Sequence, residues 1–112
     1  MKASFIILLL IFSVTAFAQD TNTGIHIPDS TKKIQTVEAS CGQCQFKLPG
    51  KGCDLAVRIN GKAYFVDGTK IDDHGDAHAA DGFCEAIRNA EVQGKIRKKR
   101  FRASYFRLLE TR

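Results

Sequence analysis

The sequence lacks an apolar run long enough to cross a membrane. Its longest run, residues 5–12, ends at Ser13, whereas a spanning helix needs about 20 apolar residues. The run follows Lys2 and precedes a small-residue site at residues 16–18, the pattern of a signal peptide cleaved after Ala18. No cysteine stands near this site, which excludes lipid attachment to an N-terminal cysteine. We therefore expect an exported protein, periplasmic or secreted, with no membrane span after cleavage.

Internal repeats and low-complexity tracts are also lacking. Cleavage after Ala18 would leave 94 of the 112 residues, which is enough for one domain and too few for two. Residues 19–32 are polar and offer only Ile25 and Ile27 for burial, so they indicate a flexible lead-in. We predict a signal peptide at 1–18, this lead-in at 19–32 and a single cysteine-containing, β-rich domain at 33–112.

Strand patterns dominate this domain. Val37, Ala39 and Cys41 alternate with polar residues, as in a strand with one covered face. Asn60-Gly61 separates two short apolar runs and favours a type I′ hairpin turn, because both of its residues tolerate positive φ. The predicted strands lie within residues 34–46, 55–59, 62–66, 91–96 and 101–109.

One helix is predicted between the third and fourth strands. Ala80, Phe83, Cys84 and Ile87 follow an i, i+3, i+4, i+7 spacing within residues 76–89, which places them on one helical stripe. The order β-β-β-α-β-β predicts an α+β fold: a small antiparallel five-stranded sheet, or an OB-like barrel, with one helix and disulfide cross-links.

The four cysteines are open to three interpretations, of which the first is structural disulfides. An even number of cysteines in a small exported domain is typical of such bridges. If the early strands pair across a turn at residues 48–49, Cys44 lies opposite Cys53 at a separation that suits a bridge. Cys41 would then pair with Cys84 on the helix.

The second interpretation is a metal site. Cys41-Gly-Gln-Cys44 has the spacing that directs two sulfurs at one zinc ion. Two further ligands would come from Cys53 and Cys84, or from His74 and His78. The second closely spaced cysteine pair of many zinc sites is missing. Zinc or another transition metal is the one cofactor that these residues suggest.

The third interpretation is a thiol-disulfide redox protein that uses Cys41 and Cys44. Such pairs depend on a helix that follows the first cysteine and lowers its pKa. Here the chain runs into a Pro49-Gly50 turn, and the sequence predicts no helix after Cys41.

A second candidate metal site lies in the polar segment before Phe83. Four potential ligands alternate here: Asp72, His74, Asp76 and His78. An extended chain would place them on one side, and a helix would make the two histidines an i, i+4 pair that suits zinc, copper or nickel. The alternative is an ordinary loop whose aspartates cap the following helix. A calcium loop is excluded, because Ala77 and Phe83 replace its glycine and glutamate.

Basic residues crowd one predicted turn. Six of the eight residues from 95 to 102 are basic: Lys95, Arg97, Lys98, Lys99, Arg100 and Arg102. With Tyr105 and Phe106 they could bind a polyanion, as in single-strand-binding barrels, or simply be solvated. Because an exported protein meets little nucleic acid, we expect anionic polymers or lipid headgroups as partners and no dedicated nucleic acid.

Several stretches carry a resemblance to a known family. They are CGQCQF at 41–46, GKGCDLAVRINGKAYFVDG at 50–68, DDHGDAHAADGFCEAIRNAEVQG at 72–94 and the terminal YFRLL. On these residues the chain resembles a family of small, uncharacterised exported bacterial proteins, chiefly from Bacteroidetes-like species, with no assigned function. The resemblance implies no activity.

Function is therefore predicted only in outline. No nucleophile or oxyanion stabiliser accompanies the carboxylates, so we expect a binding or structural module and not an enzyme. Its partner would be an unidentified small ligand or a transition metal. The alternatives are a thiol-disulfide redox protein and a polyanion-binding OB-like module. The shared expectation is that the sulfur of Cys84 meets those of the three earlier cysteines.

Overall fold

Strands account for most of the regular structure. The computed structural model describes residues 23–110, so the predicted signal peptide at 1–18 lies outside the described residues. The strands are β1 (Gln35–Cys41), β2 (Leu55–Ile59), β3 (Lys62–Asp67), β4 (Arg88–Arg97) and β5 (Arg100–Leu108). Three single turns of helix accompany them: α1 (Thr23–His26), α2 (Gly42–Gln45) and the 3₁₀ turn η1 (Ile71–His74). None of the helices in this part of the chain is long and apolar enough to span a membrane.

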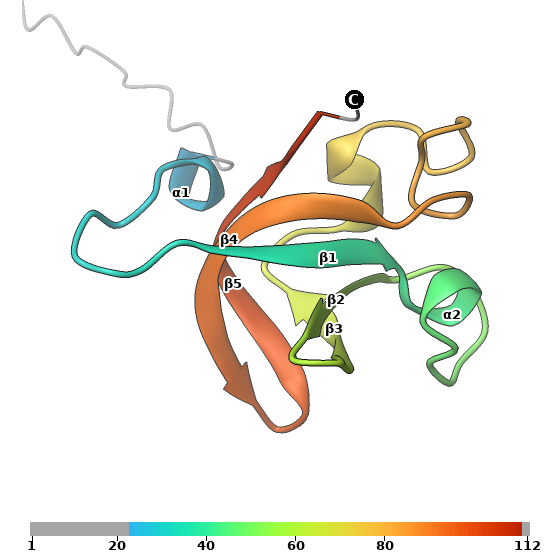
Figure 1. Cartoon of the computed structure of the whole chain (residues 1–112), viewed down its shortest axis with the longest axis horizontal. Coiled ribbons are helices and arrows are strands. Elements are labelled where there is room, and N and C mark those ends of the chain that lie inside the picture. Colours follow the sequence, from blue (N-terminus) through green and yellow to red (C-terminus); the bar gives the residue numbers. More distant parts are fainter. Residues whose placement is uncertain (1–22, 111–112) are drawn as a thin grey trace, which may run out of the picture.

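The five strands close into a barrel (Figure 1). Their order is β1-β2-β3-β5-β4, and β4 pairs back onto β1. All pairings are antiparallel except that of β3 with β5. The predicted OB-like barrel is confirmed, as a mixed sheet and not a purely antiparallel one.

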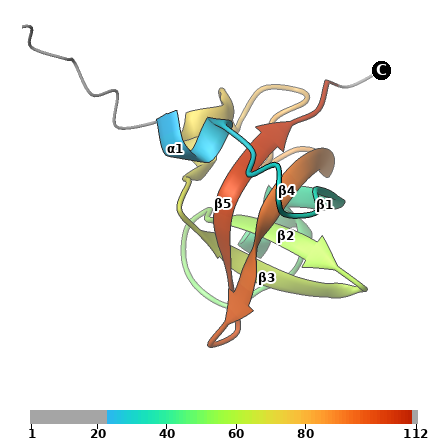
Figure 2. The same ribbon diagram turned by 90° about the vertical axis from the view of Figure 1, so that its left-hand side faces the viewer.

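Strand direction decides what meets at each end of the barrel. Because β1 runs antiparallel to both β2 and β4, it ends where they begin. The α2 turn, which follows β1, and residues 68–87, which precede β4, therefore share this end. The start of β1 and both hairpin turns lie toward the other end, as Figures 1 and 2 show.

The barrel interior is filled by alternate side chains of each strand. Val37, Ala39 and Cys41 point inward, and Val57 and Leu55 oppose the last two across the ladder. The largest fully enclosed side chains are those of Phe106, Val57 and Val92. The alternation predicted for β1 is thus confirmed. It places the Cys41 thiol inside the barrel, at the end where β1 stops.

The predicted hairpin is also confirmed. Asn60 and Gly61 have φ angles of 51° and 80°, and β2 pairs with β3 directly across them, Ile59 opposite Lys62. Two consecutive positive φ angles match the right-handed twist of the flanking strands, which is why Asn-Gly is favoured here.

The helix predicted over residues 76–89 is wrong. Between η1, which ends at His74, and β4, which begins at Arg88, the chain forms a series of turns. The turns pack tightly: a Cβ on Gly82 would clash with the carbonyl oxygens of Asp76 and Ala77. Gly82, which weakens the helical pattern, is therefore required for the chain to fold back on itself.

Hydrogen bonds from Ser40 explain why residues 76–89 do not form the predicted helix. Its Oγ is fully buried and lies 2.6 Å from the Phe83 carbonyl oxygen and 2.8 Å from that of Ala86. The amide of Cys41 also donates to the Phe83 carbonyl, at 3.1 Å. Carbonyls that a helix would use internally are thus satisfied by β1, and tertiary hydrogen bonds override the local pattern.

The described part of the predicted flexible lead-in is docked on the barrel. Ile25 of α1 packs against the core, and α1 lies beside β5 (Figure 2). The Gln93 side chain accepts a hydrogen bond from the Asp29 amide at 2.8 Å and donates to the carbonyls of Asp29 and Lys32, at 2.8 and 2.9 Å. Residues 29–32 are therefore fixed to β4, which the composition of this segment did not indicate.

Candidate metal centre

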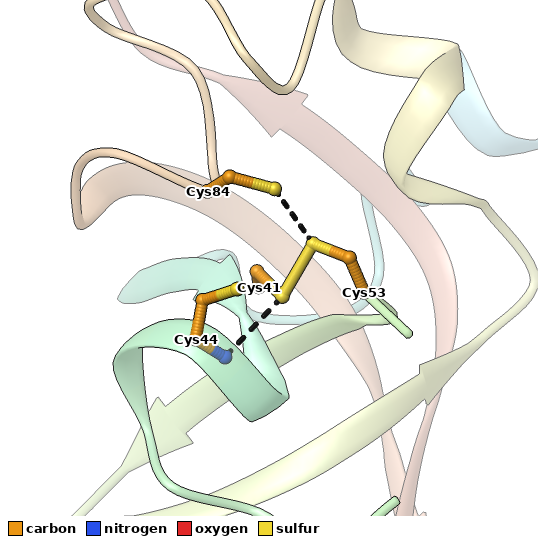
Figure 3. A group of neighbouring side chains, drawn as sticks. All are labelled: Cys41, Cys44, Cys53 and Cys84. Atoms are coloured by element: carbon orange, nitrogen blue, oxygen red, sulfur yellow. Dashed lines mark hydrogen bonds between the residues drawn. A yellow bond between two sulfur atoms is a disulfide. The ribbon is translucent and has the colours of Figure 1, made fainter. Parts of the chain in front are cut away.

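Four cysteines from separate segments meet at one end of the barrel. Cys41 is the last residue of β1, Cys44 lies in α2, Cys53 stands two residues before β2, and Cys84 lies between η1 and β4. These are the segments that strand direction brings to the same end. The predicted convergence of Cys84 with the three earlier cysteines is confirmed (Figure 3).

The four sulfurs form one compact group. All four Sγ atoms lie within 4.8 Å of one another. Tetrahedral zinc with Zn–S bonds of about 2.3 Å requires its sulfurs about 3.8 Å apart, so the group is close to the size of a tetrathiolate site. It is the only group of three or more potential metal ligands that converges within residues 23–110.

The predicted disulfide pairing is wrong. Cys44 does not lie opposite Cys53, because β1 ends at Cys41, which pairs with Leu55, and Cys44 follows on α2. Cys41 and Cys53 instead lie at disulfide distance, with Cα atoms 5.4 Å apart. The Sγ of Cys84 lies 2.8 Å from that of Cys53 (Figure 3), so the expected Cys41–Cys84 pair is not formed either.

A helical turn follows Cys41, contrary to the sequence prediction. Cys41 is the N-cap of α2, and its Sγ accepts a hydrogen bond from the Cys44 amide at 3.4 Å. An amide that donates to a sulfur stabilises the thiolate form, and such outer contacts orient metal ligands. The turn directs the Cys44 sulfur back toward the cluster.

Glutamines beside the cysteines hold the surrounding loops. Gln45 Nε2 donates to the Cys84 carbonyl at 2.9 Å and so ties α2 to the segment before β4. Gln43 donates to the Asp54 carboxylate at 2.7 Å and accepts from the Asp54 amide at 2.9 Å. Sequence reasoning missed both residues, although their positions within and directly after the Cys-x-x-Cys pair could have indicated a supporting role.

The surroundings of Cys84 disfavour its thiolate form. Burial raises the pKa of the Cys84 thiol, and the neighbouring Cys44 adds to the rise. A cation among the sulfurs would reverse this preference, since metal binding releases the thiol protons. Cys41 is fully buried, Cys53 and Cys84 are half-buried, and Cys44 is exposed.

A cavity adjoins the cluster at Cys53. Its volume is about 270 Å³. The charged residues that line it are Asp54, Lys70, Asp72 and Arg100. Of the four cysteines, Cys53 alone lines it, so the cavity lies on the Cys53 side of the sulfur group.

The aspartates and histidines predicted as a second metal site are not brought together. Neither an extended chain nor a helix carries Asp72, His74, Asp76 and His78, because η1 is followed by turns. The His74 ring packs on Phe106, with centroids 4.5 Å apart, and its Nε2 lies 2.9 Å from Thr69 Oγ1. The His78 side chain is exposed. The segment is a loop, as the alternative interpretation predicted, but no helix of the described chain follows it for its aspartates to cap.

The predicted basic residues separate into different environments. All six are exposed on the β4–β5 hairpin. Arg100 pairs with Asp67, at 2.9 Å, and lies over the Phe65 ring. Lys98 and Lys99 form the turn itself, and Tyr105 and Phe106 are buried and present no stacking surface.

Fold and cluster together define a small five-stranded barrel of OB-like topology with four cysteines gathered at one end. Residues 35–109 match the model of a family of unknown function (DUF6370), and the chain belongs to this family. The match runs from the start of β1 to just past β5 and includes all four cysteines. No curated protein matches the chain, and no solved structure does. The predicted membership of a family without known function is confirmed.

Proposed function

We propose that this protein is an exported metal-binding module that holds one zinc ion, or a similarly thiophilic ion, through Cys41, Cys44, Cys53 and Cys84. One observation carries the proposal: sulfurs from four segments, spread over more than 40 residues, lie within 4.8 Å of one another. The chemistry of the donors favours zinc, because four thiolates in a tetrahedral arrangement are typical of its structural sites.

The proposed role of the ion is structural. Four protein ligands leave no open position for substrate or water, unlike catalytic zinc sites, which keep one. The ion would link the end of β1, α2, the start of β2 and the segment before β4. These segments contain little regular structure of their own, so a shared ion would fix the open end of a small barrel.

The experiment compares cysteine variants with a histidine control. Zinc content is measured by native mass spectrometry on the full chain, purified under reducing conditions without chelator. We expect one zinc per protein, and loss of stable binding in Cys44→Ser and Cys84→Ser, because each removes a ligand. The matched control His78→Asn should keep its zinc. Retention of zinc by both cysteine variants, or its loss in His78→Asn, would contradict the proposal.

A thiol-disulfide role is the second candidate, and the approach of Cys41 to Cys53 favours it. In this form Cys41–Cys53 would be the disulfide, with Cys44 and Cys84 as thiols beside it. The predicted Cys41–Cys44 couple would be replaced by a different pair. Intact mass under denaturing conditions separates the candidates. The disulfide form is 2 Da lighter than the fully reduced chain, whereas the zinc form, once the ion is released, has the mass of the chain with all four cysteines reduced.

Export remains part of the proposal. It is supported by the apolar run at residues 5–12 and the small-residue site before Gln19. N-terminal sequencing of the protein from a cell-envelope or medium fraction should begin at Gln19. A protein that keeps Met1 and stays with the cytosolic fraction would refute export and leave the metal site untouched.

A further inference from the structure

A basic pocket lies on the β4–β5 hairpin, toward the end of the barrel opposite the cysteines. Its volume is about 210 Å³. Four cationic side chains line it together with Gly94 and Ser104: Lys32, Lys95, Arg97 and Arg102. No acidic residue of the described part of the chain lines it.

Lys32 reaches this pocket because Gln93 holds its backbone. The Gln93 side chain, only 3% exposed, makes three hydrogen bonds to the backbone of residues 29–32. The next residue, Gly94, sits at a register shift of the β4–β5 ladder, and a Cβ there would clash with the Arg102 carbonyl. The buried Gln93 side chain and the required Gly94 thus place Lys32 beside the cationic side chains of the hairpin.

The hairpin places like charges opposite one another. Lys95 faces Arg102 across the ladder, and Arg97 faces Arg100. Like charges directly opposite in an antiparallel pair destabilise it. Among residues 23–110, Lys95, Arg97 and Arg102 form no ion pair. The carboxylate of Asp29 lies 3.9 Å from Lys32 Nζ, with both side chains about half exposed. Asp67 stands opposite Arg102 across the β3–β5 ladder, but its ion pair is with Arg100. Three of the four cations that line the pocket therefore lack an ion-pair partner among the described residues.

We propose that this pocket binds one phosphate or sulfate group. Sites for drug-sized ligands measure about 300 to 1,000 Å³, so a pocket of about 210 Å³ suits a smaller group. Guanidinium groups present paired donors that match the oxygens of phosphate and sulfate, and the lysines add charge from two sides. The group belongs either to a free inorganic ion or to a monoester of a sugar, and both have the same oxyanion chemistry.

The structure divides the basic residues into binding and non-binding sets. Lys98 and Lys99 form the turn and do not line the pocket, and Arg100 is engaged by Asp67. A diffuse polyanion surface would use all of these cations about equally. A defined pocket would depend on Arg97 and Arg102 far more than on the two lysines of the turn.

The test is calorimetric titration of the purified protein with inorganic phosphate and inorganic sulfate at constant ionic strength. We expect saturable binding with one site. Arg97→Gln/Arg102→Gln should weaken it at least about tenfold, because charged hydrogen bonds are lost. The matched pair Lys98→Gln/Lys99→Gln removes the same charge and should stay within about twofold. Equal weakening by both pairs, or no saturable binding by the wild type, overturns the proposal.

A second comparison tests the contribution of the lead-in. Lys32→Gln should weaken phosphate binding several-fold, whereas Lys33→Gln, which removes the same charge outside the pocket, should not. The same effect from both variants would exclude Lys32 as a ligand-binding residue.

Titration with a sugar monophosphate and a sugar monosulfate identifies the natural ligand. If either monoester binds more tightly than the free ion, the ligand is a monoester; if the affinities are equal, the ligand is the free ion. Zinc content, measured on every variant, should be unchanged, which separates this site from the cysteine cluster.

Discussion

The His74 ring packs against two aromatic side chains of the core. It lies against Phe106 and edge-on to Phe83, and burial lowers its pKa. The adjacent Asp73 opposes this shift, whereas His26 adds to it. The folded protein therefore disfavours the protonated imidazole that the unfolded chain accepts near its ordinary pKa of 6.5.

A pH dependence of stability follows from this shift. With the folded-state pKa below the unfolded one, the contribution of neutral His74 is complete above about pH 6.5 and is lost as the pH falls through that value toward the lowered pKa. The free energy of unfolding, measured with urea between pH 7.5 and 5.5, should fall with acidification. His74→Gln should reduce this slope and His78→Asn should not. An unchanged slope in His74→Gln would contradict the account, because another group would then cause the pH dependence.

At the scale of elements, the segment before β4 is held by β1 and not by helical hydrogen bonds. The Ser40 hydroxyl provides part of this attachment through the carbonyls of Phe83 and Ala86. Since Cys84 lies between these two residues, the same contacts position one of the proposed metal ligands.

Replacing Ser40 with alanine should therefore affect both stability and metal binding. Ser40→Ala leaves the partly buried Ala86 carbonyl without this hydrogen bond, which should lower the free energy of unfolding of the metal-free protein by about 0.5 to 1.5 kcal/mol. Zinc affinity, measured by competition with a chelator, should also fall. Ser104→Ala is the control: its hydroxyl is exposed and its hydrogen bond to the Gln93 carbonyl is long, at 3.3 Å. Equal effects from the two variants would remove the special role of Ser40.

The elements that the sequence predicted correctly are those with local determinants. The Asn60-Gly61 hairpin depends on two residues that tolerate positive φ, and the β1 alternation depends on one covered face. The helix at 76–89 was wrong because only Phe83 of its four apolar positions is buried, and the deciding hydrogen bonds come from Ser40, more than 40 residues away. Local periodicity does not contain such contacts.

The candidate site was predicted in its members but not in its geometry. Convergence of the cysteines was predicted from the covered face of a strand for Cys41 and from the core-facing stripe of a helix for Cys84, although that helix does not form. The pairing of Cys44 with Cys53 failed because it assumed an uninterrupted hairpin, whereas β1 ends at Cys41 and α2 intervenes. Lys32 was assigned to a flexible lead-in because no local signal indicates that Gln93 would hold it.

For the whole molecule, the proposed ion should be a principal source of stability. Free zinc at about a thousand times its dissociation constant would stabilise the folded state by about 4 kcal/mol, which corresponds to a rise in Tm on the order of 20 °C for a domain of this size. Thermal unfolding is measured with zinc and after removal of zinc by a chelator, both under reducing conditions. Magnesium, which does not favour thiolates, serves as the control ion and should not raise Tm. A Tm that is the same with and without zinc would contradict a structural role.

The identity of the atoms around the bound ion tests the central claim most directly. X-ray absorption at the zinc edge of the reduced, zinc-loaded protein reports the type, number and distance of the ligands. The account predicts four sulfur neighbours at about 2.3 Å. A first shell dominated by nitrogen and oxygen would contradict it, because the four cysteines would then not be what holds the metal.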